Sequence, residues 1–222
     1  IGAIERKAKS GDKESEKIYK VYTEAREHLV SGDSIRSLDI DEGLFKFLDE
    51  LQLITAKPVI YVCNVDESSV INGNEHVDNV KELVANENAE ILVLGAGIES
   101  DIAELDDFEE RKMFLEDLGL EEPGVSKLIK NAYSLLNLQT YFTAGEKEVR
   151  AWTIKKGMTA PQSAGVIHTD FEKGFIKAEV IKFSDFVEYG SESSVKEAGK
   201  LMIQGKEYVV NDGDVMHFRF NV

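Results

Sequence analysis

Residues 58–63 read Pro-Val-Ile-Tyr-Val-Cys, and residues 91–94 read Ile-Leu-Val-Leu. Each run is continuous, apolar and of strand length, which is typical of a strand covered on both faces. Between the two runs, apolar residues recur at helical spacing at Val77, Val80, Leu83 and Val84. A strand-helix-strand unit is normally right-handed with parallel strands, so these stretches predict a parallel α/β sheet.

The segments that follow the two strands are the first place to look for a site. Ligands of open parallel sheets bind at the carboxyl ends of the strands. The two segments are Asn64-Val65-Asp66-Glu67 and Gly95-Ala96-Gly97-Ile98-Glu99. We expect them to lie side by side and to form one site.

The rest of the chain divides into a helical front and a tail of short strands. A turn at 10–12 precedes a helical pattern, which predicts a hairpin over residues 1–30 and a shorter helix near 44–51. We expect the hairpin to pack against a neighbouring element rather than to protrude as a contact arm. Two more helical patterns occupy 107–136. A small mixed α+β module follows, with strands expected at 141–143, 149–154, 175–181, 208–210 and 215–220.

The composition is that of a globular protein, with 42% hydrophobic and 31% charged residues among 222. No apolar stretch approaches the roughly 20 residues that span a bilayer, so no membrane partner is expected. The single cysteine, Cys63, excludes an intrachain disulfide and a cysteine zinc cluster, which favours a reducing, cytoplasmic setting. Because the chain opens at Ile1 without a signal segment, we expect it to be a piece of a longer polypeptide.

The net charge of −16 is unevenly distributed. Residues 140–222 carry 11 Lys and Arg against 12 Asp and Glu, which leaves 15 against 30 for residues 1–139. An acidic front would repel nucleic-acid phosphates, whereas the near-neutral tail is compatible with RNA. A solubilising surface is the simplest interpretation of the acidic excess.

A phosphate-binding loop is absent from the sequence. Such a loop reads GxxxxGK[ST], in which backbone amides and a lysine hold the phosphates and a hydroxyl holds Mg²⁺. The two Gly-Lys pairs, Gly199-Lys200 and Gly205-Lys206, lack the upstream glycine and the following Ser or Thr. They are interpreted as turn residues, so these residues alone are not expected to hydrolyse a nucleoside triphosphate.

Asn64-Val65-Asp66-Glu67 lies where GTPases place an Asn-Lys-x-Asp sequence. An Asn amide in that position donates to N7 of either purine, whereas the Asp carboxylate accepts from N1–H and the 2-amino group of guanine alone. Glu67 stands at the Asp position, and its extra methylene moves the carboxylate and weakens guanine selection. A carboxylate held in the guanine-reading position would be repelled or left unsatisfied by adenine, at a cost of about 1–3 kcal/mol.

The second segment strengthens this interpretation, because the small residues Gly95, Ala96 and Gly97 allow backbone amides to approach a base edge closely. A plain alternative exists for each segment. An Asn-x-x-Glu sequence after a strand also suits a helix-capping turn, and Gly95 and Gly97 also suit ordinary turns.

The chain resembles the YchF family of Obg-like ATPases in four stretches: NVDE at 64–67, IESDIAELDD at 98–107, TYFTAGEKEVRAWTIKKGMTAPQSAGVIHTDFEKGFIKAEVI at 140–181 and YVVNDGDVMHFRFNV at 208–222. The resemblance implies a P-loop domain interrupted by a helical hairpin domain and followed by a TGS domain, a ubiquitin-like β-grasp module shared with threonyl-tRNA synthetases and stringent-response enzymes. Residues 1–34 would end the hairpin domain, 35–138 the P-loop domain, and 139–222 would form the TGS domain.

The resemblance also implies an activity and partners. The intact protein would hydrolyse ATP in preference to GTP, use Mg²⁺, and associate with ribosomes as a monomer. By position, Asn64, Val65 and Glu67 belong to the base-specifying loop, and Gly95, Ala96 and Gly97 form the second base-contacting loop. The phosphate and Mg²⁺ ligands fall outside these residues, so no catalytic or metal-binding residue is assigned.

The tail offers a possible RNA surface. Lys155, Lys156, Lys173 and Lys177 can meet ribosomal RNA phosphates, and scattered surface lysines are the alternative. His168, Thr169, Asp170, Trp152 and Phe175 are interpreted as structural, because no nucleophile has an activating neighbour and β-grasp modules mostly bind. Cys63 is interpreted as inert core rather than as a redox reporter beside the nucleotide.

The alternative to an ATPase is a non-catalytic module, which docks on the ribosome, RNA or a protein through the TGS domain and on a partner through the hairpin. A synthetase or stringent-response fragment would share only the TGS part. The strand-helix-strand unit with NVDE disfavours that third possibility.

Overall fold

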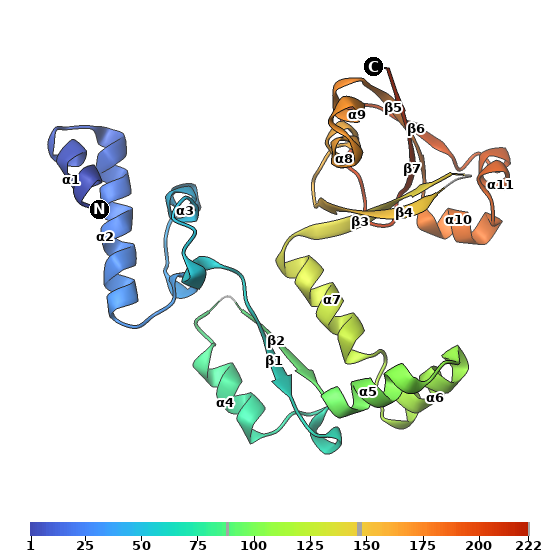
Figure 1. The fold of residues 1–222 in the computed structure, drawn as a ribbon, viewed down its shortest axis with the longest axis horizontal. Helices are drawn as coiled ribbons and strands as arrows, with labels where there is room; N and C mark the ends of the chain where they lie inside the picture. Colours follow the sequence, from blue (N-terminus) through green and yellow to red (C-terminus); the bar gives the residue numbers. More distant parts are fainter. Residues whose placement is uncertain (88, 146–147, 222) are drawn as a thin grey trace. The chain divides into compact units, whose positions relative to one another are not determined.

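The computed structural model describes residues 1–87, 89–145 and 148–221. The chain folds as two compact units, Ile1–Asn131 and Ala132–Val222 (Figure 1). Helices accompany a parallel strand pair in the first unit and a five-stranded sheet in the second, so the fold is mixed α/β, as predicted. None of the helices in the described ranges combines the length and the apolar character that a bilayer crossing needs.

The first unit begins with a helical hairpin, as the periodicity predicts. Helices α1 (Gly2–Lys9) and α2 (Lys13–Val30) are joined by a turn in which Gly11 has a φ of 88°. Asp12 caps α2 by accepting a hydrogen bond from the Ser15 amide, which satisfies one of the free amides of the first turn.

A small apolar core joins α2 to the segments that follow it. These are the 3₁₀ helix η1 (Ile35–Ser37), helix α3 (Glu42–Asp49) and the 3₁₀ helix η2 (Ile54–Ala56). The buried residues of this core are Val21, Ala25, Ile35 and Leu48. The hairpin therefore packs against its own neighbours within the unit.

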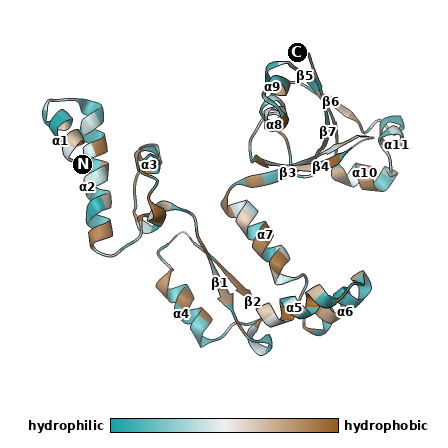
Figure 2. Cartoon of the chain, in the orientation of Figure 1, coloured by the Kyte–Doolittle hydropathy of each residue, from teal (hydrophilic) through white to brown (hydrophobic). Residues whose placement is uncertain are grey.

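The predicted strand-helix-strand unit follows. Strands β1 (Ile60–Asn64) and β2 (Glu90–Leu94) pair in parallel and are connected through η3 (Glu67–Ser69) and helix α4 (Glu75–Leu83). Figure 2 colours both strands mostly as hydrophobic. The expectation that β1 is covered on both faces is wrong, because Val62 is 46% exposed; this two-stranded sheet has too few neighbouring elements to cover both faces.

Three helices follow β2: α5 (Ala96–Glu104), α6 (Phe108–Asp117) and α7 (Gly124–Leu135). Ile98 and Ile102 of α5 pack on Leu115 of α6 in a third apolar cluster. The division between the two units falls within α7, and strand β3 begins three residues after this helix ends.

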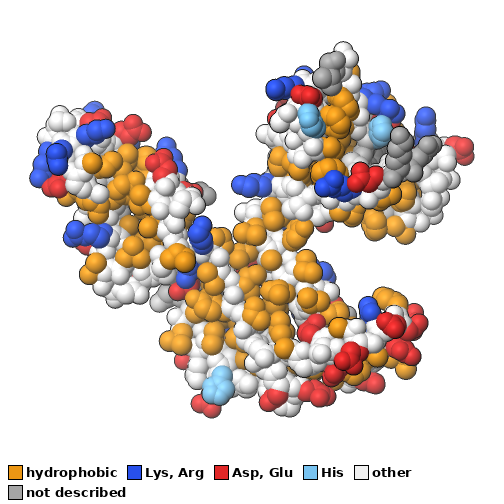
Figure 3. Space-filling view, in the orientation of Figure 1, with side chains coloured by type: hydrophobic (Ala, Val, Ile, Leu, Met, Phe, Trp, Pro, Cys, Tyr) orange, Lys and Arg blue, Asp and Glu red, His pale blue; other side chains and the backbone are white. Residues whose placement is uncertain are grey.

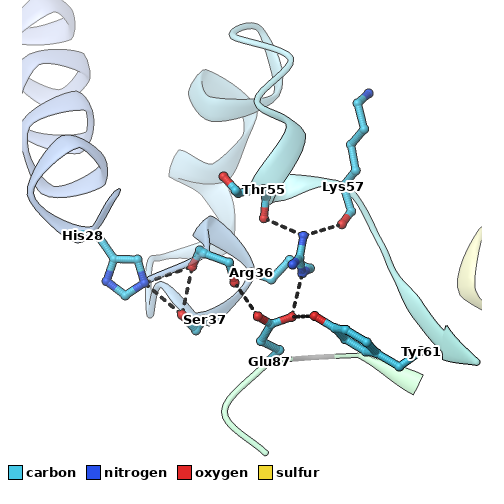
Figure 4. A network of polar contacts seen from close by, with 8 residues as sticks. His28, Arg36, Ser37, Thr55, Lys57, Tyr61 and Glu87 are labelled. Carbon is cyan, nitrogen blue, oxygen red and sulfur yellow. Dashed lines mark hydrogen bonds and ion pairs between the residues drawn. The ribbon is translucent and has the colours of Figure 1, made fainter. Parts of the chain in front are cut away.

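A polar network joins the segment after the hairpin to the parallel strand pair (Figure 4). Glu87 accepts hydrogen bonds from Arg36 Nε at 3.0 Å, Tyr61 Oη at 3.0 Å and Ser34 Oγ at 3.1 Å. Arg36 also donates to the carbonyl oxygens of Thr55 and Lys57. The Arg36 and Glu87 side chains are only 13% and 19% exposed, so the pair is shielded from solvent.

The second unit is built on a five-stranded sheet with the order β4-β3-β7-β5-β6. The strands are β3 (Leu138–Ala144), β4 (Val149–Lys155), β5 (Phe175–Ile181), β6 (Met202–Gln204) and β7 (Val215–Phe220). β3 and β7 are parallel neighbours, and the other pairs are antiparallel. The helices are α8 (Ala160–Ile167), α9 (Thr169–Lys173), α10 (Phe183–Tyr189) and α11 (Glu192–Glu197).

The core of this unit lies between the sheet and α8. Its fully buried members include Tyr141 of β3, Ala160 and Ala164 of α8, Ala178 of β5 and Met216 of β7. Tyr141 donates its hydroxyl proton to the carbonyl oxygen of Ser163. Burial raises the pKa of Tyr141 far above its usual value, which keeps the hydroxyl protonated as a donor.

Two strand assignments in this unit differ from the sequence pattern. Residues 208–210 do not form the expected strand, because only Val209 makes an isolated bridge, to Thr159, while Tyr208 turns its hydroxyl toward Asp214. The short strand β6 (Met202–Gln204) was not predicted, since three residues carry too little periodicity to identify a strand.

Candidate functional site

The two strand tips lie side by side, as predicted. Asn64 is paired in register with Leu94, and the amide of Val65 donates to the Leu94 carbonyl oxygen at 2.9 Å. The side-chain oxygen of Asn64 accepts a hydrogen bond from the Ala96 amide at 2.9 Å. A side chain at the end of one strand thus fixes the start of the segment that follows the other.

This contact also orients the Asn64 amide. Because Oδ1 faces the Ala96 N–H, the Nδ2 group points its two protons elsewhere, and no described residue accepts a hydrogen bond from it. Asn64 is exposed, so the group is accessible to a ligand.

Gly95, Ala96 and Gly97 are not the loop that the glycines suggest. Helix α5 begins at Ala96, with Gly95 as its N-cap. Asn64 supplies the acceptor that Gly95 cannot, which allows the helix to start directly after the strand. Ala96 and Gly97 are exposed while Gly95 is buried, so the start of the helix is accessible beside Asn64, although the Ala96 amide is itself bonded to Asn64 Oδ1.

The backbone requires small residues at the first of these positions. A Cβ on Gly95 would lie 3.3 Å from the Val65 carbonyl oxygen and 3.2 Å from Ile98 Cδ1. One on Gly97 would meet nothing within 4 Å. Gly95 is therefore needed for the close approach of the two segments, and Gly97 leaves open space over the first turn of α5.

The two acidic residues after Asn64 have different roles. Asp66 caps η3, where its carboxylate accepts from the Ser69 amide at 3.0 Å and from Ser68 Oγ at 2.8 Å. Hydrogen bonds from Ser69 and Ser68 hold the pKa of Asp66 below its usual value. Glu67 is exposed, and no described residue donates a hydrogen bond to its side chain, so its carboxylate is available to a ligand. The segment does form a helix-capping turn, as the alternative interpretation of Asn-x-x-Glu proposed, but the cap of η3 is Asp66 rather than either residue of that pattern.

Glu99 belongs to the same region and was not identified as a site residue. Its two carboxylate oxygens accept from the amides of Gly124 at 2.6 Å and Val125 at 3.1 Å, the first residues of α7. Nothing in the sequence signals this contact, since it joins helices 25 residues apart and each sequence alone is an ordinary helical pattern.

The four lysines proposed for RNA are not gathered in one patch. Lys155 lies opposite Leu138 at one end of the strands. Lys177 lies opposite Arg219 beyond the other end of β3, and Lys173 ends the helix just before β5. Lys156 follows Lys155 directly, so the register separates the lysines into two pairs.

The other polar and aromatic residues singled out in the tail have structural contacts. His168 Nδ1 accepts a hydrogen bond from the Asp170 amide and caps α9. Trp152 donates Nε1–H to Thr143 and lies beneath Arg150, whose guanidinium carbon is 4.0 Å from the ring centroid. Within the described ranges, no group of three or more His, Cys, Asp or Glu side chains is arranged to hold a metal ion.

Charge is unevenly distributed along the first unit. Basic side chains gather over the hairpin and acidic ones over α6 in the view of Figure 3. Helix α1 carries Arg6, Lys7 and Lys9, whereas the first turn of α6 carries Glu109 and Glu110. The acidic excess of the front of the chain therefore does not extend to the hairpin tip.

Comparisons with known proteins cover the whole chain. Residues 138–221 match the family YchF-GTPase_C, described as a protein of unknown function (DUF933). The chain is 50% identical over 224 residues to the ribosome-binding ATPase YchF of Bacillus subtilis, covering all of this chain and 61% of that protein. It is likewise 50% identical over 222 residues to the protein of the same name in Escherichia coli O157:H7, with the same coverage. The chain thus spans about three fifths of the length of the curated relatives it matches.

A solved structure is similar as well. The YchF GTPase of Schizosaccharomyces pombe is 36% identical and superposes with a TM-score of 0.77, covering 96% of this chain and 55% of that one. The likeness therefore includes both units rather than the C-terminal region alone.

Proposed function

Since the chain belongs to the YchF family, we propose that it is part of a ribosome-binding P-loop ATPase and that its strand tips select the purine base. The relatives carry that name, and the chain spans only part of their length. The observation that carries the proposal is the hydrogen bond between Asn64 and Ala96. It supports a site in which the Asn64 side-chain amide, the start of α5 and the Glu67 carboxylate meet one edge of the base.

The base preference follows from the groups at this edge. Asn64 Nδ2 is placed to donate to purine N7, a contact that ATP and GTP share. Glu67 begins η3 with an extra methylene relative to Asp, so its carboxylate is displaced from the guanine-reading position. The first-turn amides of α5 supply donors beside Asn64. ATP is therefore the proposed nucleotide, since nothing at this edge is built to require the 2-amino group of guanine.

The domain boundaries and cofactor follow from the family. We assign residues 1–34 to the end of the hairpin domain, 35–138 to the P-loop domain and 139–222 to a TGS domain. The sheet order β4-β3-β7-β5-β6, with parallel neighbours β3 and β7, supports a β-grasp assignment for the last. Mg²⁺ is the proposed metal of the intact protein, with ligands outside these residues.

We further propose that the TGS domain contacts the ribosome or its RNA, and that the protein is cytoplasmic and monomeric. The ribosome-binding relatives support the partner and the compartment. The pair Lys155 and Lys156, which are both exposed, is the contact we favour, because adjacent lysines at one strand end act together on phosphates.

The proposal is tested with the full-length protein that contains these residues. ATP is expected to bind more tightly than GTP, by about tenfold or more for the loss of one buried polar contact. Tighter GTP binding would refute the base assignment. Ribosome co-sedimentation is expected to be lost on deleting 139–222, and unchanged co-sedimentation would refute the role of that domain.

A further inference from the structure

Glu99 joins two helices that are distant in sequence. From the first turn of α5, Glu99 accepts hydrogen bonds from the first two amides of α7: Gly124 donates to Oε1 at 2.6 Å and Val125 to Oε2 at 3.1 Å. A negatively charged acceptor is favourable at the start of a helix, where free amides and the helix dipole carry partial positive charge. Here the cap comes from another helix, so it holds α7 to α5.

The junction is closely packed as well as polar. Gly124 is buried, and a Cβ there would lie 2.9 Å from Glu99 Oε1 and 3.0 Å from Leu94 Cβ. A larger residue at this position would displace the Glu99 carboxylate or crowd Leu94 at the end of β2. Leu94 is also the residue whose carbonyl oxygen accepts from the Val65 amide.

These contacts form an unbroken path from the base site. Asn64 holds the Ala96 amide, and the Glu99 amide donates to the Gly95 carbonyl oxygen at 3.0 Å. Glu99 is therefore one helical turn from the residue that Asn64 fixes. Any shift of the first turn of α5 also moves the carboxylate that holds α7.

We propose that Glu99 is a positioning residue that couples purine binding at the strand tips to the docking of the first turn of α7. The inference rests on the proposed nucleotide site and adds its regulation. Coupling of this kind is reciprocal, because an element shared by two equilibria must affect both. Base binding orders the first turn of α5 and so strengthens the cap, and a docked α7 holds that turn ready for the base. Helix α7 is followed along the chain by β3, the first strand of the second unit.

A cap that only stabilises α7 would behave differently from a coupling residue. Removing a plain cap lowers stability and leaves base discrimination unchanged. Removing a positioning residue also changes the affinity ratio between ATP and GTP. Glu122 provides the matched control, because this acidic residue lies two positions before the start of α7 but pairs with Lys130 at 2.6 Å and not with the helix amides.

The experiment uses the full-length protein, a non-hydrolysable ATP analogue and hydrogen exchange at the Gly124 and Val125 amides. We expect the analogue to slow exchange at both amides in the wild type. Glu99→Ala should weaken analogue binding about tenfold, equivalent to about 1.4 kcal/mol, lower the ATP-to-GTP ratio and abolish the change in exchange. Glu122→Gln should match the wild type. Gly124→Ala displaces the Glu99 carboxylate from the α7 amides, so it should reproduce the losses expected for Glu99→Ala.

The possible failures are distinguishable. If the wild type does not bind the analogue, the proposed function is refuted. If it binds and Glu99→Ala keeps the same affinity, ratio and exchange response, the coupling is refuted and the function stands. Should Glu99→Ala unfold, Glu99→Gln retains one acceptor oxygen for Gly124 and is measured instead. The side-chain NH2 of Gln cannot accept from Val125, so a weakened exchange response together with a lowered ATP-to-GTP ratio in that folded variant supports the coupling, and an unchanged response or an unchanged ratio refutes it.

Discussion

The side-chain oxygen of Asn64 lies 2.9 Å from the backbone nitrogen of Ala96, so the last residue of β1 caps the first residue of helix α5. The contact determines which end of the Asn64 amide faces outward. It also explains how a helix can begin at Gly95-Ala96-Gly97, where the sequence suggests a loop. A purine edge placed here would meet a donor from each of two segments.

Changing Asn64 to Asp separates the structural role from the binding role. An Asp oxygen can still accept from the Ala96 amide, so α5 should start normally. The amide donor is replaced by a carboxylate that repels N7, and nucleotide affinity of the full-length protein should fall about 10- to 100-fold. Fluorescence titration with an ATP analogue measures the change. Wild-type affinity in Asn64→Asp, with an unaltered circular dichroism spectrum, would contradict the assignment.

Shortening Glu67 to Asp should move the nucleotide preference toward GTP. The shorter side chain returns the carboxylate to the position that reads N1–H and the 2-amino group of guanine. We expect the ATP-to-GTP affinity ratio to fall about tenfold, the value of one charge-assisted hydrogen bond. Glu75→Asp, at an exposed position in the first turn of α4, is the matched control. The same ratio in both variants would contradict a base-reading role for Glu67.

The Arg36–Glu87 pair should stabilise the first unit in a pH-dependent way. Burial alone would raise the pKa of Glu87, but hydrogen bonds from Arg36, Tyr61 and Ser34 outweigh it and hold the pKa below its usual value. A lowered folded-state pKa contributes stability that is present above the unfolded value and is lost as pH falls through the folded value. We therefore expect Glu87→Gln to cost about 2–4 kcal/mol at pH 7 and less below pH 4.

Urea unfolding of wild type and variant at the two pH values tests this prediction. Asp78→Asn is the control, since Asp78 pairs with Lys81 at 2.9 Å but both side chains are more than half exposed. Exposed pairs contribute about 0–1 kcal/mol. An equal loss in both variants, or a loss that does not change with pH, would count against the network.

Asp214 should be essential to the second unit, because it is fully buried. Lys182 donates to its Oδ1 at 2.6 Å, and Tyr208 and the Asn211 amide donate to Oδ2 at 2.8 and 2.9 Å. Asp214→Ala leaves these donors without an acceptor, so we expect a loss of about 3–5 kcal/mol in the free energy of unfolding. Glu148→Gln, which alters a solvent-exposed pair 3.9 Å from Arg150, should cost under about 1 kcal/mol.

The stabilisation that Lys182 contributes to the same network should be lost at alkaline pH. Burial lowers the pKa of Lys182, but hydrogen bonds to Asp214 and Tyr208 raise it above its usual value. A raised folded-state pKa means that the stabilisation is complete below the unfolded value and is lost as pH rises through the folded value. The difference in unfolding free energy between wild type and Lys182→Met should therefore shrink above about pH 10.5. A difference that is constant from pH 7 to pH 11 would contradict this.

The parts of the fold that the sequence predicts are those with local periodicity. The apolar runs identify β1, β2, β5 and β7, and the parallel pairing of the first two is confirmed. The strand pairing of the second unit could not be predicted from local periodicity, because β3 pairs with β7, which lies more than 70 residues further along the chain. Tyr208–Val210 has the composition of a strand, but its polar contacts hold it outside the sheet.

Only part of the arrangement of the candidate site could be predicted from the sequence. Adjacent strand tips follow from parallel pairing alone, which places Asn64 near Ala96. Which carboxylate is accessible does not follow from the sequence, because it is decided by the hydrogen bonds that Asp66, and not Glu67, accepts from Ser68 and Ser69. Glu99 could not have been found, since its partner Gly124 is defined by packing against Leu94 rather than by any sequence pattern.

The most direct measurement is nuclear magnetic resonance of the full-length protein labelled with ¹⁵N at asparagine and glycine. On addition of an ATP analogue, the Asn64 side-chain amide and the Gly97 backbone amide should shift together and saturably, whereas the Asn74 side-chain amide, whose oxygen caps α4, should stay unchanged. Saturable binding that leaves the Asn64 and Gly97 signals unmoved would contradict a purine site at the two strand tips.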